Sequence, residues 1–176
     1  MLITKTFEIE CAHRIYNHLG KCHSLHGHTY HIEVGIEGNL NEQDMVMDYS
    51  NLKNVFKKAI GDKFDHSTII SKDDHFLKFC LITVPGLLDD KTFWEYLKDK
   101  INNIEDFKYQ LEFSKDKYWN IHLMDGNITA ENLACTWFNV LNMFLEDKDY
   151  ILSYVKVWET PTSMACYSVT DSIIKE

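Results

Sequence analysis

The sequence has few of the features that mark membrane, secreted or disulfide-rich proteins. It contains two prolines and a single arginine among 176 residues. Its longest apolar run, residues 79–88, is about half as long as a transmembrane helix requires. The N-terminal residues lack the apolar segment of a signal peptide, so we expect a cytoplasmic protein. The five cysteines have no spacing typical of a disulfide framework, which favours reduced thiols and the same compartment.

Positive charge is also scarce, and this narrows the choice of partners. Lysine and arginine total 18 against 27 acidic residues, a net charge of −9, which argues against nucleic acid or an anionic membrane surface as partner. The one arginine, Arg14, directly follows His13. A hydrophobic content of 45% excludes a disordered chain. Without linkers or repeats, the chain is expected to form one domain, residues 1–176.

Alternating hydrophobic and polar residues predict four strands. Residues 6–13 and 26–38 alternate clearly, and in the second stretch three histidine or aromatic positions continue the apolar side. Two further strands, residues 154–160 and 164–170, lie near the C-terminus. We therefore expect two pairs of strands, one at each end of the chain.

Helical periodicity appears between these two pairs of strands. Residues 50–60 repeat at helical spacing, and Gly61 is expected to end this helix. A stronger helix begins after Thr129, a good N-cap. Between the helices lies an insert, at about residues 76–122, in which Thr92–Glu95 resembles a capping box. This order of strands and helices predicts an α+β domain. We expect the insert to be an elaboration of the surface; the alternative is a lid over the substrate.

Three histidines are placed to bind one metal ion. His26 and His28 are two residues apart on a strand, so their side chains point the same way with Cβ atoms about 6–7 Å apart. His13 ends the neighbouring strand on its apolar side. Catalytic zinc sites use three protein ligands and leave one position open. The alternative is a chance pair on a partly exposed strand, but unsatisfied imidazoles on an apolar face would be costly.

A thiol and an acid–histidine pair accompany the histidines. Cys22 lies four residues before His26, and a thiol near Zn²⁺ has a lowered pKa and can act as base or nucleophile. The alternative is that Cys22 completes a closed structural Cys-His₃ site. Such a site would not explain Asp65–His66, in which the carboxylate can orient the imidazole for proton transfer.

A cupin barrel is a remote alternative. Gly20, His26, His28 and Glu33 have a spacing similar to the first cupin metal motif. Glu33, however, is expected on the strand face opposite the two histidines. The second cupin motif is absent, and two amphipathic helices are too many for a jelly roll.

An ordered set of motifs resembles a known enzyme family. The stretches "FEIECAHR", "CHSLHGH", "MVMDYSNLK", "FDHSTI", "GNITAENLA" and "VKVWETPTSMACY" are similar to the 6-pyruvoyltetrahydropterin synthase / 6-carboxytetrahydropterin synthase family. The resemblance covers nearly the whole chain except the insert. It implies a tunnelling fold, an antiparallel sheet of two β-hairpins with two helices on one face. It also implies homo-oligomers, trimers or hexamers, whose sheets close a barrel with active sites between subunits.

The resemblance implies a role for each candidate site residue. Zinc would be bound by His13, His26 and His28, and Cys22, Asp65 and His66 would be catalytic. Glu159 would anchor the pterin, whose amino group and ring N–H can donate two parallel hydrogen bonds to a carboxylate; a solvated strand-end glutamate is the alternative. Thr129 and Glu131 would line the pterin pocket, although both also suit a helix cap and first turn.

The expected reaction is zinc-dependent conversion of 7,8-dihydroneopterin triphosphate, a small-molecule substrate. Three residues separate Cys22 from His26, as in carboxy-forming relatives of queuosine biosynthesis; pyruvoyl-forming relatives have five. We therefore expect 6-carboxy-5,6,7,8-tetrahydropterin, acetaldehyde and triphosphate as products. The alternatives are a 6-pyruvoyltetrahydropterin synthase and a catalytically idle zinc-binding assembly.

The other four cysteines are expected to be small buried hydrophobes: Cys11, Cys80, Cys135 and Cys166.

Overall fold

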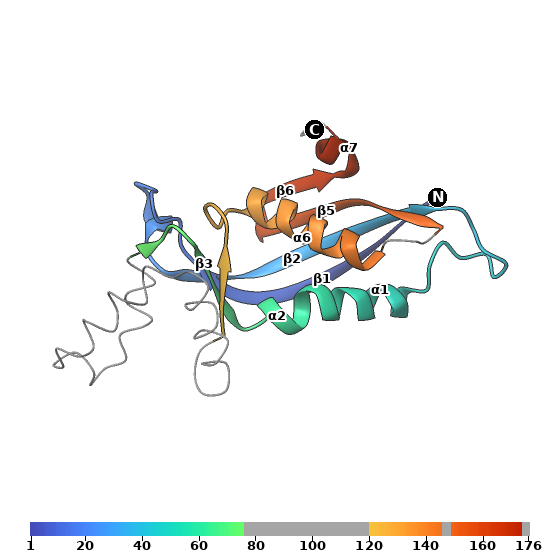
Figure 1. Cartoon of the computed structure of the whole chain (residues 1–176), viewed down its shortest axis with the longest axis horizontal. Helices are drawn as coiled ribbons and strands as arrows, with labels where there is room; N and C mark the ends of the chain where they lie inside the picture. The colour runs from blue at the N-terminus through green and yellow to red at the C-terminus, as the bar shows by residue number, and fades with distance from the viewer. Residues whose placement is uncertain (76–119, 146–148, 174–176) are drawn as a thin grey trace.

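The computed structural model describes residues 1–75, 120–145 and 149–173, which contain one six-stranded sheet (Figure 1). The strand order is β4-β3-β1-β2-β5-β6. Its antiparallel part consists of β1 (Leu2–His13), β2 (His26–Gly38), β5 (Tyr150–Thr160) and β6 (Ser163–Ser168). These are the two expected pairs of strands, joined through β2 and β5.

Two short strands that periodicity did not predict extend the sheet beyond β1. β3 (Ser67–Ser71) pairs with β1 in parallel, and β4 (Ile121–Met124) pairs with β3 in parallel. The sheet is therefore mixed. Strands this short, in apolar runs such as "STIIS", do not alternate and carry no period that distinguishes them from a helix.

The first helix does not end at the expected residue. α1 (Tyr49–Phe56) is N-capped by Asp48, whose carboxylate accepts from Ser50 N at 2.6 Å. It continues as the π-helical turn η2 (Lys57–Gly61) and the short α2 (Asp62–Phe64). Gly61 keeps right-handed helical dihedral angles, so the prediction of a stop there is wrong. One further turn buries Phe64, and the chain leaves the helix at Asp65.

The second long helix, α6 (Ala130–Leu145), packs with α1 on one face of the sheet (Figure 1). As predicted, Thr129 caps it, with its hydroxyl accepting from Asn132 N at 3.3 Å. Phe56 stacks on Phe7 of β1 with ring centroids 3.9 Å apart. Trp137 of α6 meets Tyr30 of β2 edge to face. Burial of each such side chain contributes about 1.5–3 kcal/mol, so this face carries the core.

The opposite face of the sheet has no helix packed on it among the described residues, and its side chains are mostly polar or charged. Cys166 of β6 is exposed there, so the expectation that it is buried is wrong; Cys135 is half-buried and Cys11 is buried. Cys80 and the expected capping box at Thr92 lie outside the described residues. Within the described part of the chain, no helix has the length and apolarity needed to cross a membrane.

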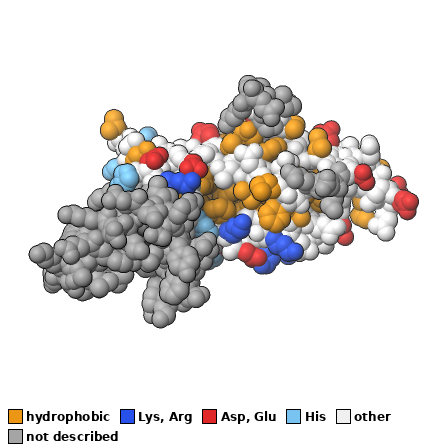
Figure 2. Space-filling view, in the orientation of Figure 1, with side chains coloured by type: hydrophobic (Ala, Val, Ile, Leu, Met, Phe, Trp, Pro, Cys, Tyr) orange, Lys and Arg blue, Asp and Glu red, His pale blue; other side chains and the backbone are white. Residues whose placement is uncertain are grey.

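The last predicted strand is two residues shorter than expected. β6 ends at Ser168 because its backbone N–H and hydroxyl both donate to Asp171, at 2.8 and 2.7 Å. This starts the short helix α7 (Val169–Ile173). At the other end of the sheet, Figure 2 shows histidine side chains near the loop that joins β1 to β2.

Candidate functional site: a histidine cluster at the end of the sheet

The pairing of β1 with β2 brings the three predicted metal ligands together. His13 lies opposite His26, and Cys11 lies opposite His28, so the three imidazoles share one face of the sheet. Their ring centroids are 4.6 Å (His13–His26), 5.3 Å (His13–His28) and 4.9 Å (His26–His28) apart. This is the face covered by the helices, and the cluster continues the hydrophobic core to the end of the sheet.

Glu159 completes the cluster, because a bulge in β5 carries it. Trp158 pairs with Met164 and Thr160 pairs with Ser163, so Glu159 is an extra residue between them. Its Oε1 lies 3.3 Å from Nε2 of His13 and 3.6 Å from Nε2 of His28. One ligand atom from each of the four residues lies within 4.8 Å of the others. Glu159 is only 24% exposed and does not behave as a solvated strand-end residue.

Hydrogen bonds from Nδ1 to backbone carbonyls orient two of the three imidazoles. Nδ1 of His13 donates to the carbonyl of Ile128, just before α6, at 2.7 Å. Nδ1 of His26 donates to the carbonyl of Ser24 at 2.8 Å. A carbonyl can only accept, so the proton of each neutral ring is on Nδ1 and a lone pair remains on Nε2. The Ile128 carbonyl was not identified from sequence, since a backbone acceptor leaves no residue signature.

Burial favours the uncharged form of His13 and His28. Desolvation lowers the pKa of His13 to about 4, with His26 and His28 adding to the effect and the Ile128 hydrogen bond opposing it. Burial also lowers the pKa of His28, against the opposing charge of Glu159. At neutral pH these rings are therefore in the form that coordinates a metal ion.

The atoms of the cluster fit a cation. Nε2 of both His13 and His28 is buried without a hydrogen-bond partner. Because Nδ1 of His13 carries the ring proton, its Nε2 lone pair faces a carboxylate oxygen of Glu159, and no proton lies between these two acceptors. Buried polar atoms are rarely left in this condition. A metal ion bound by the three imidazoles would satisfy the unpartnered nitrogens, and three imidazoles near a carboxylate form a suitable donor set.

Two alternative sites do not match this arrangement. Cys22 is not a member of the metal-binding group found in the described residues, which disfavours a closed Cys-His₃ site. Glu33, the fourth ligand of the cupin alternative, lies on the opposite face, as expected. There it accepts from Lys156 Nζ at 2.8 Å and from Tyr154 Oη at 2.9 Å.

Cys22 lies in the loop between β1 and β2. It occupies a single 3₁₀ turn, η1 (Lys21–His23), and its carbonyl accepts from Ile15 N at 2.8 Å. The side chain is half-buried. Burial raises the pKa of Tyr30, and the proximity of Cys11, Glu159 and Cys22 adds to this effect. Cys22 is thus within electrostatic range of the residue that packs against His28.

The Asp65–His66 pair is fixed to the edge of β1. Oδ1 of Asp65 accepts from Glu10 N at 3.0 Å and lies 3.1 Å from Nδ1 of His66. The Glu10 N–H, with the His66 contacts, holds the pKa of Asp65 below its ordinary value. His66 adopts φ 55°, an uncommon value for a non-glycine residue, and its N–H donates to the Glu10 carbonyl at 2.7 Å. Its side chain is 78% exposed.

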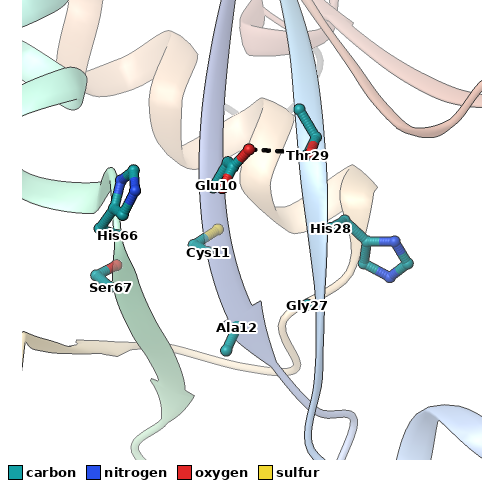
Figure 3. Close-up of a pocket in the computed structure, with 8 residues that line it drawn as sticks. All are labelled: Glu10, Cys11, Ala12, Gly27, His28, Thr29, His66 and Ser67. Carbon is teal, nitrogen blue, oxygen red and sulfur yellow. Dashed lines mark hydrogen bonds between the residues drawn. The ribbon is translucent and has the colours of Figure 1, made fainter.

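The pair and the histidine cluster are separated within one chain. A shallow hollow beside His66 is lined by residues of β1, β2 and β3 (Figure 3). Both His28 and His66 contribute to this lining, but in that view His66 lies beside β1 and the imidazole of His28 points away from it, beyond β2. In the described part of the chain, no hydrogen bond or ion pair links Asp65 or His66 to Cys22 or to the histidine cluster. The structure therefore assembles the predicted metal ligands but does not unite them with the predicted acid–base pair.

The two residues expected to line the pterin pocket lie at the start of α6. Thr129 serves as its cap, and Glu131 is an exposed first-turn acid. Both follow Ile128, whose carbonyl holds His13. The capping role that the sequence allowed for Thr129 is thus confirmed, while a role in ligand binding stays a prediction.

Known proteins similar to this chain agree with these observations. The family model for 6-pyruvoyl tetrahydropterin synthase matches residues 2–169. A 6-carboxy-5,6,7,8-tetrahydropterin synthase from Haemophilus influenzae is 31% identical over 169 residues, covering 94% of this chain and 96% of that protein.

Solved structures show the same architecture. An uncharacterized protein from Wolinella succinogenes superposes with a TM-score of 0.69 at 24% identity, covering 96% of this chain and 98% of its own. The 6-pyruvoyl tetrahydropterin synthase of Caenorhabditis elegans gives a TM-score of 0.58 at 20% identity, with 96% and 94% covered. The expected tunnelling fold is confirmed. On this match of nearly the whole chain, the protein belongs to the 6-pyruvoyl tetrahydropterin synthase family.

Proposed function

We propose that the protein is a zinc-dependent 6-carboxy-5,6,7,8-tetrahydropterin synthase. Its substrate would be 7,8-dihydroneopterin triphosphate, and its products 6-carboxytetrahydropterin, acetaldehyde and triphosphate, within queuosine and 7-deazapurine biosynthesis. The observation that carries the proposal is the cluster of His13, His26, His28 and Glu159, whose ligand atoms lie within 4.8 Å of one another and in which Nε2 of His13 and Nε2 of His28 lack a hydrogen-bond partner. Family membership and the name of the Haemophilus relative support the substrate class.

His13, His26 and His28 would hold the zinc ion. Two of the three already have Nδ1 engaged by a backbone carbonyl, the arrangement that fixes the tautomer of metal-binding histidines. Bound zinc would act as a Lewis acid that stabilises negative charge developing on the substrate's side-chain oxygens. The family's pterin-anchoring role falls on Glu159, whose carboxylate would accept from the pterin amino group and ring N–H when substrate is bound.

Proton transfer would be carried out by the other two elements of the site. Cys22, as thiolate, would remove a proton from the substrate side chain. His66 would relay protons, and its Nδ1 contact with Asp65 would stabilise the protonated ring. The exposed position of His66 leaves its Nε2 accessible to a group outside the chain.

The separation of His66 from the histidine cluster supports an active site shared between subunits. Within one chain the imidazole of His28 points away from His66 (Figure 3), so a second copy would have to supply the missing part. We therefore propose a trimer or hexamer. Sedimentation analysis of the zinc-loaded protein tests this, because a monomer that retains full activity would contradict a shared site.

The choice of product rests on the loop before the metal ligands. Three residues separate Cys22 from His26, the spacing expected of carboxy-forming members. A shorter loop would hold the thiolate differently relative to the substrate's C1′–C2′ bond and favour its cleavage. Loss of triphosphate without this cleavage would instead give 6-pyruvoyltetrahydropterin, the alternative function.

Mass spectrometry of an anaerobic reaction with 7,8-dihydroneopterin triphosphate distinguishes the two functions. We expect 6-carboxytetrahydropterin together with acetaldehyde, trapped as a hydrazone. Formation of 6-pyruvoyltetrahydropterin without acetaldehyde would change the product but retain the substrate and family. No conversion by the zinc-loaded oligomer would support a catalytically idle zinc-binding assembly.

A further inference from the structure

The single arginine of the chain forms a buried, two-pronged ion pair. Nε of Arg14 donates to Oδ2 of Asp74 at 2.5 Å, and Nη2 donates to Oδ1 at 2.6 Å. The side chains are only 7% and 2% exposed. Charged residues are seldom buried to this extent unless their geometry is well satisfied. The pair therefore holds two segments of the chain in a defined relative orientation.

The two segments are the β1–β2 loop and the stretch that follows β3. Arg14 directly follows the metal-ligand candidate His13, and Asp74 lies three residues after the end of β3. The remaining arm of the guanidinium, Nη1, donates to the carbonyl of His23 at 3.4 Å. Arg14 thus links Asp74 to the residue next to Cys22.

Further hydrogen bonds connect this point to the thiol and the metal ligands. Ile15 N, the residue after Arg14, donates to the Cys22 carbonyl at 2.8 Å. Nδ1 of His23 donates to the Tyr16 carbonyl at 3.0 Å, which closes the loop on itself. The chain between His13 and His26 is therefore held from both sides at the turn that carries Cys22. Asp74 provides the support outside the loop.

We propose that Arg14 and Asp74 are positioning residues that set the location of the Cys22 thiol relative to the histidine cluster. Neither touches the cluster through its side chain in the described contacts. Their effect is exerted through the backbone of residues 15–23. The planar guanidinium of Arg14 donates to Asp74 and to the His23 carbonyl at the same time and so fixes this backbone relative to Asp74. A lysine could not make both contacts in this geometry, since it has no rigid planar set of donors. This inference rests on the proposed catalytic role of Cys22.

The test compares Asp74→Asn with Asp73→Asn in the zinc-loaded full-length protein. Asp73 is the exposed neighbour and provides the same chemical change one residue away. We expect Asp74→Asn to lower kcat by about 10- to 100-fold, the scale of a misplaced catalytic group. KM and the zinc content per chain should stay close to the unmodified protein. Asp73→Asn should leave all of these unchanged.

A second readout does not depend on turnover. The rate at which iodoacetamide alkylates Cys22, followed by mass spectrometry of its peptide, should change several-fold in Asp74→Asn and not in Asp73→Asn. If the protein makes no pterin product, the proposed function fails, and the alkylation rates alone decide whether the pair positions the thiol.

Two outcomes would overturn the inference. One is an Asp74→Asn protein with unmodified kcat and alkylation rate. The other is a loss of activity that disappears after normalisation to folded, zinc-containing protein. Should Asp74→Asn fail to fold, Arg14→Lys takes its place, because it keeps the charge opposite Asp74 but loses the simultaneous contact with His23. A normal kcat and alkylation rate in folded Arg14→Lys would equally contradict the proposal.

Discussion

Two carboxylates on opposite faces of the same sheet are in opposite chemical conditions. Glu33, on the face without helices, accepts hydrogen bonds from Lys156 and Tyr154, and these contacts lower its pKa. Glu159, on the helix-covered face, has Oε1 3.3 Å from Nε2 of His13 and 3.6 Å from Nε2 of His28, and neither nitrogen has a hydrogen-bond partner. The hydrogen bonds of the first site are complete within the protein, whereas the second site has the donor atoms to hold a cation.

The difference shows how an acidic residue in a structural ion pair can be distinguished from one in a functional site. Both are partly buried, with 23% and 24% of their side chains exposed, so burial does not separate them. The two carboxylates differ instead in the hydrogen-bond donors that surround them. Beside Glu159, Nε2 of His13 and Nε2 of His28 lack hydrogen-bond partners, and buried polar atoms left in this condition are where bound ions are found.

The largest effect is expected on zinc binding, when a residue of the histidine cluster is replaced. His26→Ala removes one of three nitrogen ligands and should abolish stoichiometric zinc binding, measured by elemental analysis of dialysed protein. His31→Ala is the matched control, since His31 is on the same strand, faces the other way and pairs with exposed Glu8. Stoichiometric zinc in His26→Ala would rule out the proposed ligand set.

A large effect on turnover is expected from Cys22→Ala. As a positioned base, Cys22 should contribute about 10²-fold or more to kcat, while zinc content and pterin binding are retained. Cys166→Ala, on the exposed face, should behave as the unmodified protein. Steady-state kinetics and elemental analysis on the same samples check this. Loss of zinc together with activity would favour the closed Cys-His₃ site.

The two faces should also respond to pH in different ranges. In metal-free protein, His13 has a pKa of about 4 in place of its ordinary 6.5. Below pH 6.5 the unfolded chain binds a proton that the folded protein excludes, so stability is lost as pH falls from 6.5 to about 4. The loss amounts to about 3 kcal/mol.

Denaturant unfolding across this pH range measures the effect. His13→Gln should remove most of the loss between pH 6.5 and 4, with His28 contributing the rest, and His18→Gln, in the exposed part of the loop, should leave the loss unchanged. Glu33 acts in a lower range: its pKa is depressed, so its contribution is present above its ordinary value of 4.5 and is lost on further acidification. A pH-independent stability of the metal-free protein between 6.5 and 4 would contradict the buried, neutral state of His13.

The smallest effects come from neutralising the two carboxylates. Glu159→Gln should raise KM for the pterin by about 10-fold or more, the scale of a charge-assisted hydrogen bond, with little change in stability. Glu33→Gln should leave KM unchanged and lower stability by about 1 kcal/mol, as expected for a partly exposed ion pair. Steady-state kinetics and denaturant unfolding of both variants check this. A raised KM in Glu33→Gln together with a stability loss in Glu159→Gln would contradict the assigned roles.

The sequence by itself determined the main strands, the two long helices and the grouping of the three histidines that we predict to bind metal. Strand periodicity is local, and His26 and His28 share a face because they are two residues apart. The path of the helix through Gly61 was not predicted, because burial of Phe64 outweighs the preference of glycine for a helix end.

Only the tertiary structure decided how these pieces meet. Strands β3 and β4 are too short to carry a periodic signal, and their pairing depends on contacts distant in sequence. The partnership of Arg14 with Asp74 spans 60 residues, and that of His13 with Ile128 spans 115. The separation of His66 from the histidine cluster likewise depends on β1 lying between β3 and β2. Local propensities cannot encode such contacts, because the free energy that selects them comes from burial and hydrogen bonding in the folded chain.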